Sequence, residues 1–175
     1  KKTPAKFNIN FSLNFSNDKK NIAVFVSQYD HCLQDILIRD SLGEIDGKIK
    51  LIISNHKNLE SLAMAKSKNI DFYYLPITKE NKLKQEQKEI EILKKNKIDV
   101  IVLARYMQIL TNKIINHYPD KIINIHHSFL PAFIGAKPYK QAFDRGVKLI
   151  GATSHYVTAT LDDGPIIEQN VNCLN

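Results

Sequence analysis

Asn124, His126 and Asp162 are the residues of this sequence whose types and spacing suggest catalysis. Asn124 and His126 alternate along the apolar run 122–125 and its end, so on a strand their side chains share one face. An amide donor beside an imidazole can polarise a carbonyl group and stabilise the oxyanion formed when that carbonyl is attacked. Asp162, from the loop 158–164, can orient or charge the imidazole or position a water molecule. The alternative interpretation is that Asn124 and His126 only satisfy backbone groups where the strand ends.

Three other kinds of site fit the sequence less well. Ser128 stands alone, without the Gly-x-Ser-x-Gly turn that presents the nucleophile of many serine hydrolases. No glycine-rich loop follows the first apolar run, where residues 27–31 read Ser-Gln-Tyr-Asp-His, and this counts against nucleotide or phosphosugar binding. His126 and His127 point to opposite faces of a strand, and together with His155 they lack the spacing of a metal site. We therefore expect no metal ion and no cofactor.

Strands and helices alternate along the chain from residue 21 onward. Short apolar runs predict buried strands, and apolar residues at helical spacing predict helices. The strands are expected at 22–26, 48–54, 72–75, 100–103, 122–125 and 149–157, and the helices at 32–37, 59–68, 78–97 and 139–145. This alternation is typical of βαβ units, so we predict an α/β fold with a mostly parallel, Rossmann-like sheet and helices on both faces. Because ligands of such sheets bind outside the carboxyl ends of the strands, a site is expected around residues 124–131.

Individual residues mark the ends of two of these helices. Thr78 is placed to cap the long charged helix 78–97 through its hydroxyl. Pro138 is well suited to open the helix 139–145, and Gly146 is well suited to end it.

Length and composition set limits on the class of protein. The 175 residues, 43% hydrophobic and 25% charged, fit one globular domain. No run approaches the ~18 apolar residues of a membrane span, and two cysteines suggest reduced thiols in the cytoplasm. The net charge of +7 raises the question of nucleic acid, yet only three of the 25 basic residues are arginine, the residue that such proteins favour. We therefore expect no membrane and no nucleic-acid partner.

The motifs around these residues resemble the folate-dependent formyltransferase superfamily. The resemblance covers about residues 20–170. It rests on Asn124-Ile-His126, Ser128-Phe-Leu-Pro131, Phe133-x-Gly135 and His155-Tyr-Val-Thr158-x-x-Leu-Asp162-x-Gly164-Pro165. Within the superfamily, the segments 30–33, 103–110 and 126–139 are similar to those of the hydrolase branch, the deformylases.

The resemblance implies the formyltransferase fold and the hydrolysis of 10-formyltetrahydrofolate to tetrahydrofolate and formate. That reaction supplies formate for purine biosynthesis and balances one-carbon pools, without a metal or a covalent intermediate. It also implies that Asn124, His126 and Asp162 are catalytic. The implied folate-binding residues are Met107, Gln108, Ile109, Leu110, His127, Gly135, His155 and Thr158. The implied partner is the folate substrate, and the implied assembly is a homo-oligomer.

The branch of the superfamily decides which molecule accepts the formyl group. Transferase relatives that act on glycinamide ribonucleotide carry a glycine-rich phosphate loop after the first strand and usually proline after the catalytic histidine. Residues 27–31 and His127 stand at those positions here, which favours water as the acceptor. A transferase acting on glycinamide ribonucleotide or on methionyl-tRNA, an inactive folate-binding module and a basic RNA-binding domain remain alternatives.

The resemblance also predicts how the chain is divided. We expect residues 1–20 to be an N-terminal segment, the remnant of a preceding module of the ACT type. Residues 21–175 are expected to form a formyltransferase-like catalytic domain that is truncated at its C-terminus.

Overall fold

A computed structural model of the protein describes residues 18–57, 59–135 and 137–173, and within them seven strands form one sheet. The strands are β1 (Lys20–Val26), β2 (Gly47–Ser54), β3 (Asp71–Tyr74), β4 (Val100–Ala104), β5 (Ile122–His126), β6 (Leu149–Tyr156) and β7 (Ile166–Cys173). The helices are α1 (His31–Ser41), α2 (Leu59–Ser67), α3 (Lys82–Lys95), α4 (Asn112–His117) and α5 (Pro138–Asp144). The expected segment 1–20 lies almost entirely outside the described residues.

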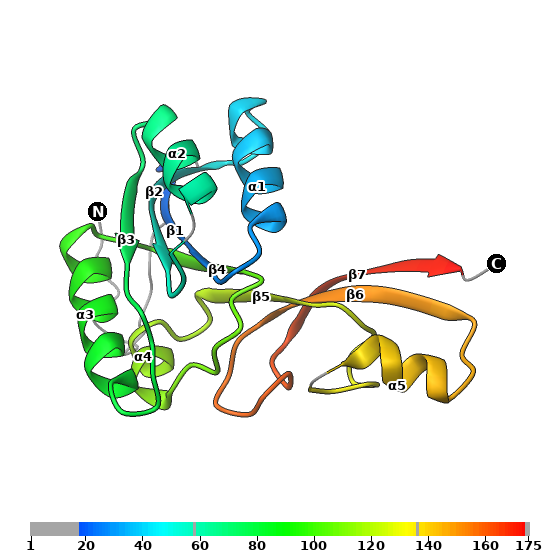
Figure 1. Cartoon of the computed structure of the whole chain (residues 1–175). Coiled ribbons are helices and arrows are strands. Elements are labelled where there is room, and N and C mark those ends of the chain that lie inside the picture. Colours follow the sequence, from blue (N-terminus) through cyan, green and yellow to red (C-terminus); the bar gives the residue numbers. More distant parts are fainter. Residues whose placement is uncertain (1–17, 58, 136, 174–175) are drawn as a thin grey trace, which may run out of the picture.

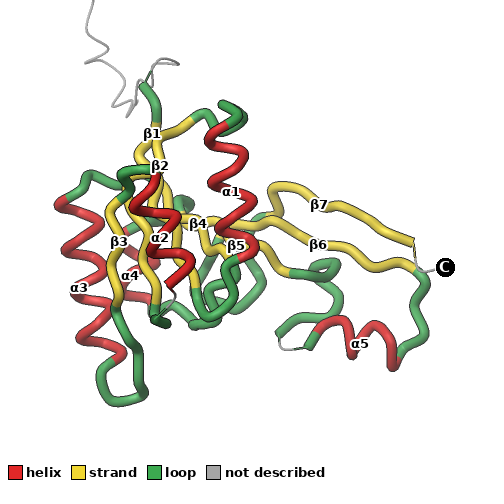
Figure 2. Tube along the Cα trace, turned by 45° about the horizontal axis from the view of Figure 1, so that its top comes forward, coloured by secondary structure: helices red, strands yellow, loops and turns green. Residues whose placement is uncertain are grey.

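The strand order is β3-β2-β1-β4-β5-β6-β7, and helices cover both faces of the first part of the sheet (Figures 1 and 2). The pairs from β3 to β5 are parallel, whereas β6 is antiparallel to both β5 and β7. Helices α1 and α2 lie on one face, and α3 and α4 lie on the other. The predicted fold class is therefore confirmed.

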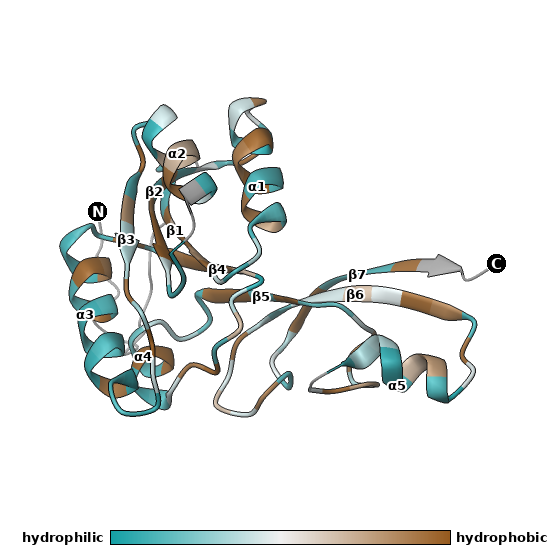
Figure 3. Ribbon diagram, viewed as in Figure 1, coloured by the Kyte–Doolittle hydropathy of each residue, from teal (hydrophilic) through white to brown (hydrophobic). Residues whose placement is uncertain are grey.

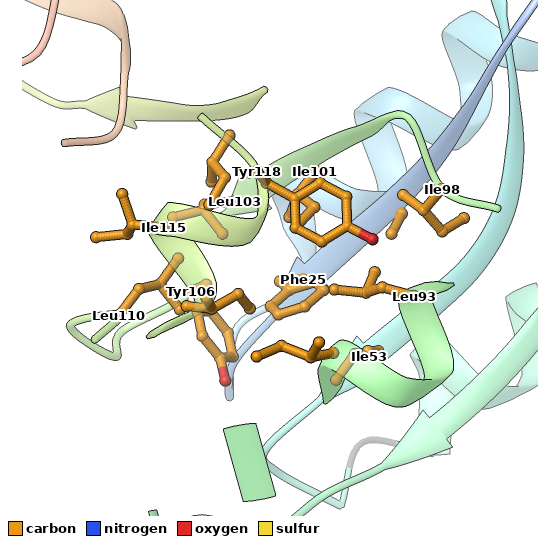
Figure 4. Close-up of a cluster of buried hydrophobic side chains, with 14 of the residues drawn as sticks. Phe25, Ile53, Leu93, Ile98, Ile101, Leu103, Tyr106, Leu110, Ile115 and Tyr118 are labelled. Atoms are coloured by element: carbon orange, nitrogen blue, oxygen red, sulfur yellow. The ribbon is translucent and has the colours of Figure 1, made fainter. Parts of the chain in front are cut away.

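Strand β1 is apolar on both faces because both faces are covered. Ala23 and Phe25 join the cluster beneath α3 and α4 (Figure 4), while Val24 and Val26 join the cluster beneath α1 and α2. Continuous apolar runs of this kind are typical of parallel strands buried between helices. Figure 3 shows the apolar strands at the centre and polar residues along the outer surfaces of the helices.

The β6–β7 hairpin extends away from the parallel strands, with α5 along one side (Figure 1). Pro138 is the first residue of α5, as predicted, and Gly146 follows the helix with a φ of +65°. Glycine adopts that left-handed conformation without the steric cost that other residues meet. This end of the sheet brings β6 alongside β5, which carries the residues expected to be catalytic.

Two helical features differ from the sequence-based predictions. Helix α3 begins at Lys82 instead of Thr78, because Thr78 and Asn81 exchange hydrogen bonds in the turn before it. That exchange closes a local turn, so the prediction that Thr78 caps the helix is wrong. The short helix α4 was not predicted; the Thr111 hydroxyl caps it by accepting a hydrogen bond from the Lys113 N–H.

Glu89, on the sheet-facing side of α3, is expected to make stability depend on pH. Burial raises its pKa to about 7, an effect to which Glu86 adds and which Tyr106 and Lys82 oppose. A folded-state pKa above the unfolded value means that the folded protein binds the proton more tightly, so stability is greatest at low pH and is lost as pH rises toward 7. Between pH 5 and pH 8 we expect the free energy of unfolding contributed by Glu89 to fall by roughly 2–3 kcal/mol.

Denaturant unfolding at both pH values, with the variant Glu89→Gln, measures this effect. The variant is expected to lose most of the pH dependence, whereas Glu91→Gln, at an exposed position of the same helix, is expected to keep it. An equal change in the free energy of unfolding between pH 5 and pH 8 in wild type and Glu89→Gln would contradict the prediction.

Candidate active site at the carboxyl end of β5

Asn124 and His126 lie on β5, near the carboxyl end of the strand, which is where ligands of α/β proteins bind. In the antiparallel register of β5 and β6, Asn124 is paired directly with His155. Asp162 comes from the turn between β6 and β7, with a φ of +54°, and is buried. The sheet and this turn therefore bring together three of the residues singled out in the sequence and add His155 to them.

His126 is enclosed by oxygen atoms. Its Nδ1 lies 3.5 Å from Oδ2 of Asp162, and its Nε2 donates a hydrogen bond of 3.0 Å to the carbonyl of Phe133. The same Asp162 Oδ2 accepts a hydrogen bond of 3.0 Å from the Gly135 N–H. Both nitrogens of the imidazole thus face acceptors, an arrangement that favours a donor role for His126.

His155 lies between Asn124 and Asp162. Its Nδ1 donates to the carbonyl of Tyr156 at 2.9 Å, so its Nε2 accepts the amide N–H of Asn124 at 3.2 Å. The same Nε2 lies 3.8 Å from Asp162 Oδ1. Because Asn124 Nδ2 carries two hydrogens, a second N–H is available for a carbonyl oxygen of a ligand. Sequence reasoning placed His155 at the site without predicting this contact.

Ser128 and Phe133 belong to the loop that covers His126. The Ser128 hydroxyl lies 3.3 Å and 3.2 Å from the carbonyls of Ala132 and Phe133 and donates to them. The proton of this hydroxyl is directed at the backbone, and the expectation that Ser128 is not a nucleophile stays a prediction. The Phe133 carbonyl was missed by sequence reasoning, because a main-chain acceptor leaves no mark in the side-chain pattern.

The segment expected to contact folate is largely exposed. Met107 and Ile109 are 65% and 63% exposed, Gln108 is partly buried, and Leu110 packs in the core beneath α3 and α4. Among the described residues, no hydrogen bond or ion pair joins this segment to the catalytic candidates. Thr158, also expected at the folate site, donates to the carbonyl of Thr160 within its own turn.

His127 and Arg105 lie beside the site, and only Arg105 adds charge to it. The His127 ring lies 5.1 Å from that of Tyr139, and burial, His126 and Arg105 lower the pKa of His127. The Arg105 guanidinium lies 4.5 Å from the centroid of the Tyr29 ring and donates to His31 Nε2 at 3.3 Å. Arg105 therefore gives this side of the site a positive charge.

A cavity of about 890 Å³ lies at the carboxyl ends of β1, β2 and β3, separate from Asn124, His126 and Asp162. It is lined by Gln28, Tyr29, Asp30, His31, Asn55, His56, Lys57, Glu60 and Tyr74. The lining holds two carboxylates, Asp30 and Glu60, and one lysine, Lys57. Asp30 accepts hydrogen bonds from Gln34 and Ser61, so this loop presents a carboxylate where a phosphate loop presents glycine amides.

Two absences can be stated for the residues that the structure describes. They contain no group of three or more histidine, cysteine, aspartate or glutamate side chains arranged to hold a metal ion. No helix among them is long and apolar enough to cross a membrane. The expectation of a metal-free reaction stays a prediction.

The fold and the site are those of the formyl transferase family: the model of that family matches residues 20–173, and the chain belongs to it. Over 161 residues it is 56% identical to a formyltetrahydrofolate deformylase of Synechocystis, covering 92% of this chain and 56% of that relative. The crystal structure of a formyltetrahydrofolate deformylase from Pseudomonas syringae superposes with a TM-score of 0.85 at 46% identity, covering 91% of this chain and 53% of that one.

A transferase structure is similar in fold but less similar in sequence. Glycinamide ribonucleotide transformylase 1 from Symbiobacterium toebii has a TM-score of 0.82 and 31% identity, covering 93% of this chain and 77% of that one. The resemblance to the deformylase branch is therefore confirmed. The chain spans little more than half the length of the deformylases that it matches.

Proposed function

We propose that the protein hydrolyses 10-formyltetrahydrofolate to tetrahydrofolate and formate. The observation that carries the proposal is the buried contact between His126 and Asp162, with Asn124 beside it on β5. The similarity to proteins named formyltetrahydrofolate deformylase supports the same substrate. Formate released in this way would serve purine biosynthesis and balance the one-carbon pools.

In the proposed reaction, the oxygen of a water molecule forms a bond to the formyl carbon. The formyl oxygen then carries negative charge, which the N–H groups of Asn124 and His126 stabilise. In the structure, the Nε2–H of His126 donates to the Phe133 carbonyl. In the proposed reaction, the formyl oxygen takes the place of that carbonyl as the acceptor. Asp162 positions the water and holds the imidazole. The bond from carbon to N10 breaks, and N10 takes the proton that the water loses.

Water is the proposed acceptor because the loop after β1 does not suit a phosphorylated amine. Asp30 adds negative charge there, and Tyr29 and His31 are bulky where a phosphate needs close approach to backbone amides. The segment 107–110 is the proposed contact for the pterin ring, with Met107 and Ile109 exposed to receive it.

Gly164→Ala is expected to damage the site through the backbone. A Cβ at position 164 would lie 1.7 Å from the carbonyl oxygen of Tyr156, the group that accepts the hydrogen bond from His155. The Tyr156 backbone must move, which costs about 1–3 kcal/mol, and a shift of the site by about 1 Å can lower kcat about 10²-fold. Thermal unfolding and steady-state kinetics measure both effects, with Asp163→Ala as the neighbouring exposed control. A Gly164→Ala enzyme with wild-type kcat would contradict the prediction.

We also propose that the reaction needs no metal ion or cofactor. Dialysis against a chelator is expected to leave both activity and the melting temperature unchanged, because the described residues offer no tetrahedral ligand set. Activity lost on dialysis and restored by one divalent ion would contradict this expectation. A cytoplasmic location and a homo-oligomeric assembly are further parts of the proposal that await measurement.

A formate-release assay tests the proposed function against transfer to an amine. Incubation with 10-formyltetrahydrofolate alone is expected to yield formate and tetrahydrofolate in a one-to-one ratio. Added glycinamide ribonucleotide is expected neither to bind nor to speed the loss of the formyl group. Formylated glycinamide ribonucleotide as the main product would overturn the hydrolase and favour a transferase with the same folate site.

A further inference from the structure

One face of helix α3 holds the segment 106–111 by polar contacts. Lys82, Glu86 and Glu89 are spaced by four and three residues, so they lie on the same side of the helix. Figure 1 shows α3 at the left of the sheet, beside α4. The segment between β4 and α4 therefore passes along this face of α3.

Each of these three side chains contacts a different part of the segment. Lys82 Nζ donates to the carbonyl of Ile109. The two carboxylate oxygens of Glu86 accept the backbone N–H of Thr111 at 3.0 Å and the Thr111 hydroxyl.

The third contact fixes the start of the segment. Glu89 Oε1 accepts the hydroxyl of Tyr106 at 3.1 Å. The ring of Tyr106 packs edge-on against Phe25 in the core, with 5.2 Å between ring centroids (Figure 4).

A further contact to the segment comes from Ser27, the residue that follows β1. Ser27 Oγ accepts the Met107 N–H at 2.8 Å and donates to Asn55 Oδ1 at 2.8 Å. The segment is thus fixed at its start, middle and end, while the side chains of Met107 and Ile109 stay exposed.

Burial makes the carboxylates of α3 costly. Glu86 and Glu89 are both buried, next to Ile90 and Leu93 of the same helix, and Glu89 Oε2 has no hydrogen-bond partner among the residues that the structure describes. The free energy lost when a carboxylate is desolvated can exceed the free energy gained from its contacts. Apolar residues of similar volume therefore often stabilise a protein more. Stability alone therefore does not account for two carboxylates at these positions.

We propose that Glu86 and Glu89 are positioning residues for the folate ligand. They fix the backbone of residues 106–111 so that Met107 and Ile109 present a preformed surface to the pterin ring. This inference rests on the proposed function, which places that segment at the folate site. A preformed surface raises affinity because less conformational freedom is lost on binding. The contribution belongs to binding, and the chemical step at His126 does not depend on it.

The test compares Glu86→Ala and Glu89→Ala with wild type in three measurements: the Kd of tetrahydrofolate, the kcat of formate release and hydrogen exchange of the amides of 106–111. Each variant is expected to raise Kd about tenfold, keep kcat at saturation within about threefold and speed amide exchange in the segment. Glu89→Gln retains an acceptor for the Tyr106 hydroxyl and is expected to restore the wild-type Kd.

A second buried residue of α3 provides the matched control. Ile90→Val costs about 0.5–1.5 kcal/mol of stability without touching a polar contact, and is expected to leave Kd unchanged. An equal rise in Kd for Ile90→Val, or unchanged Kd in both alanine variants, would overturn the inference. Tetrahydrofolate binding that depends on Glu86 without formate release would uphold the inference while overturning the hydrolase.

Discussion

Replacing Asn124 by alanine is expected to lower kcat by about 10²–10³, the usual loss for one oxyanion donor. The Asn124 amide has one N–H on His155 and a second for the formyl oxygen. Because that second bond strengthens as charge develops on the oxygen, the Kd for folate is expected to change much less than kcat. Steady-state formate release and tetrahydrofolate binding measure the two quantities separately.

Asn116→Ala, at an exposed position of α4, is the matched control for the loss of an asparagine. It is expected to have wild-type kcat. If Asn124→Ala also retained near-normal kcat, Asn124 would have no place in the mechanism and His126 would be left as the principal donor.

Asp162→Asn is expected to lower kcat by about 10³–10⁴, a larger effect than that of Asn124→Ala. A loss of this size is typical when an amide replaces the carboxylate that orients a catalytic imidazole. Asp162 faces both His126 and His155, at 3.5 Å and 3.8 Å, so the substitution removes a charge that two rings share. The amide can still place an oxygen near the Gly135 N–H, and the fold is expected to survive. The measurement is kcat together with the melting temperature.

Asp163 offers a control one residue away, because it is exposed. Asp163→Asn is expected to leave both quantities unchanged. A folded Asp162→Asn protein with kcat within tenfold of wild type would show that neither the orientation of His126 nor the placement of water depends on this carboxylate.

Much of the fold could be predicted because its signals are local. The apolar runs at 22–26 and 100–103 coincide with the cores of β1 and β4, since strands buried on both faces leave continuous apolar stretches. Asn124 and His126 were placed on one face by strand periodicity alone, and both lie beside Asp162, directly or through His155.

What the sequence did not reveal depends on pairing between distant segments. The contact of Asn124 with His155 requires the antiparallel register of β5 and β6, which no local pattern specifies. The carboxylates of Glu86 and Glu89 looked like part of a charged helix, yet the 106–111 segment buries them. Thr78 is of a residue type that often caps helices. Its hydroxyl instead accepts the N–H of Asn81 in a turn that precedes the helix.

The most direct measurement of the central claim is the origin of the oxygen atoms in the released formate. In water enriched in ¹⁸O, without an added acceptor, direct attack of water on the formyl carbon predicts formate with one labelled oxygen, formed together with tetrahydrofolate. The same experiment with Asn124→Ala is expected to give labelled formate at a rate lower by about 10²–10³. Unlabelled formate, or no formate unless an amine acceptor is supplied, would contradict the proposed hydrolysis.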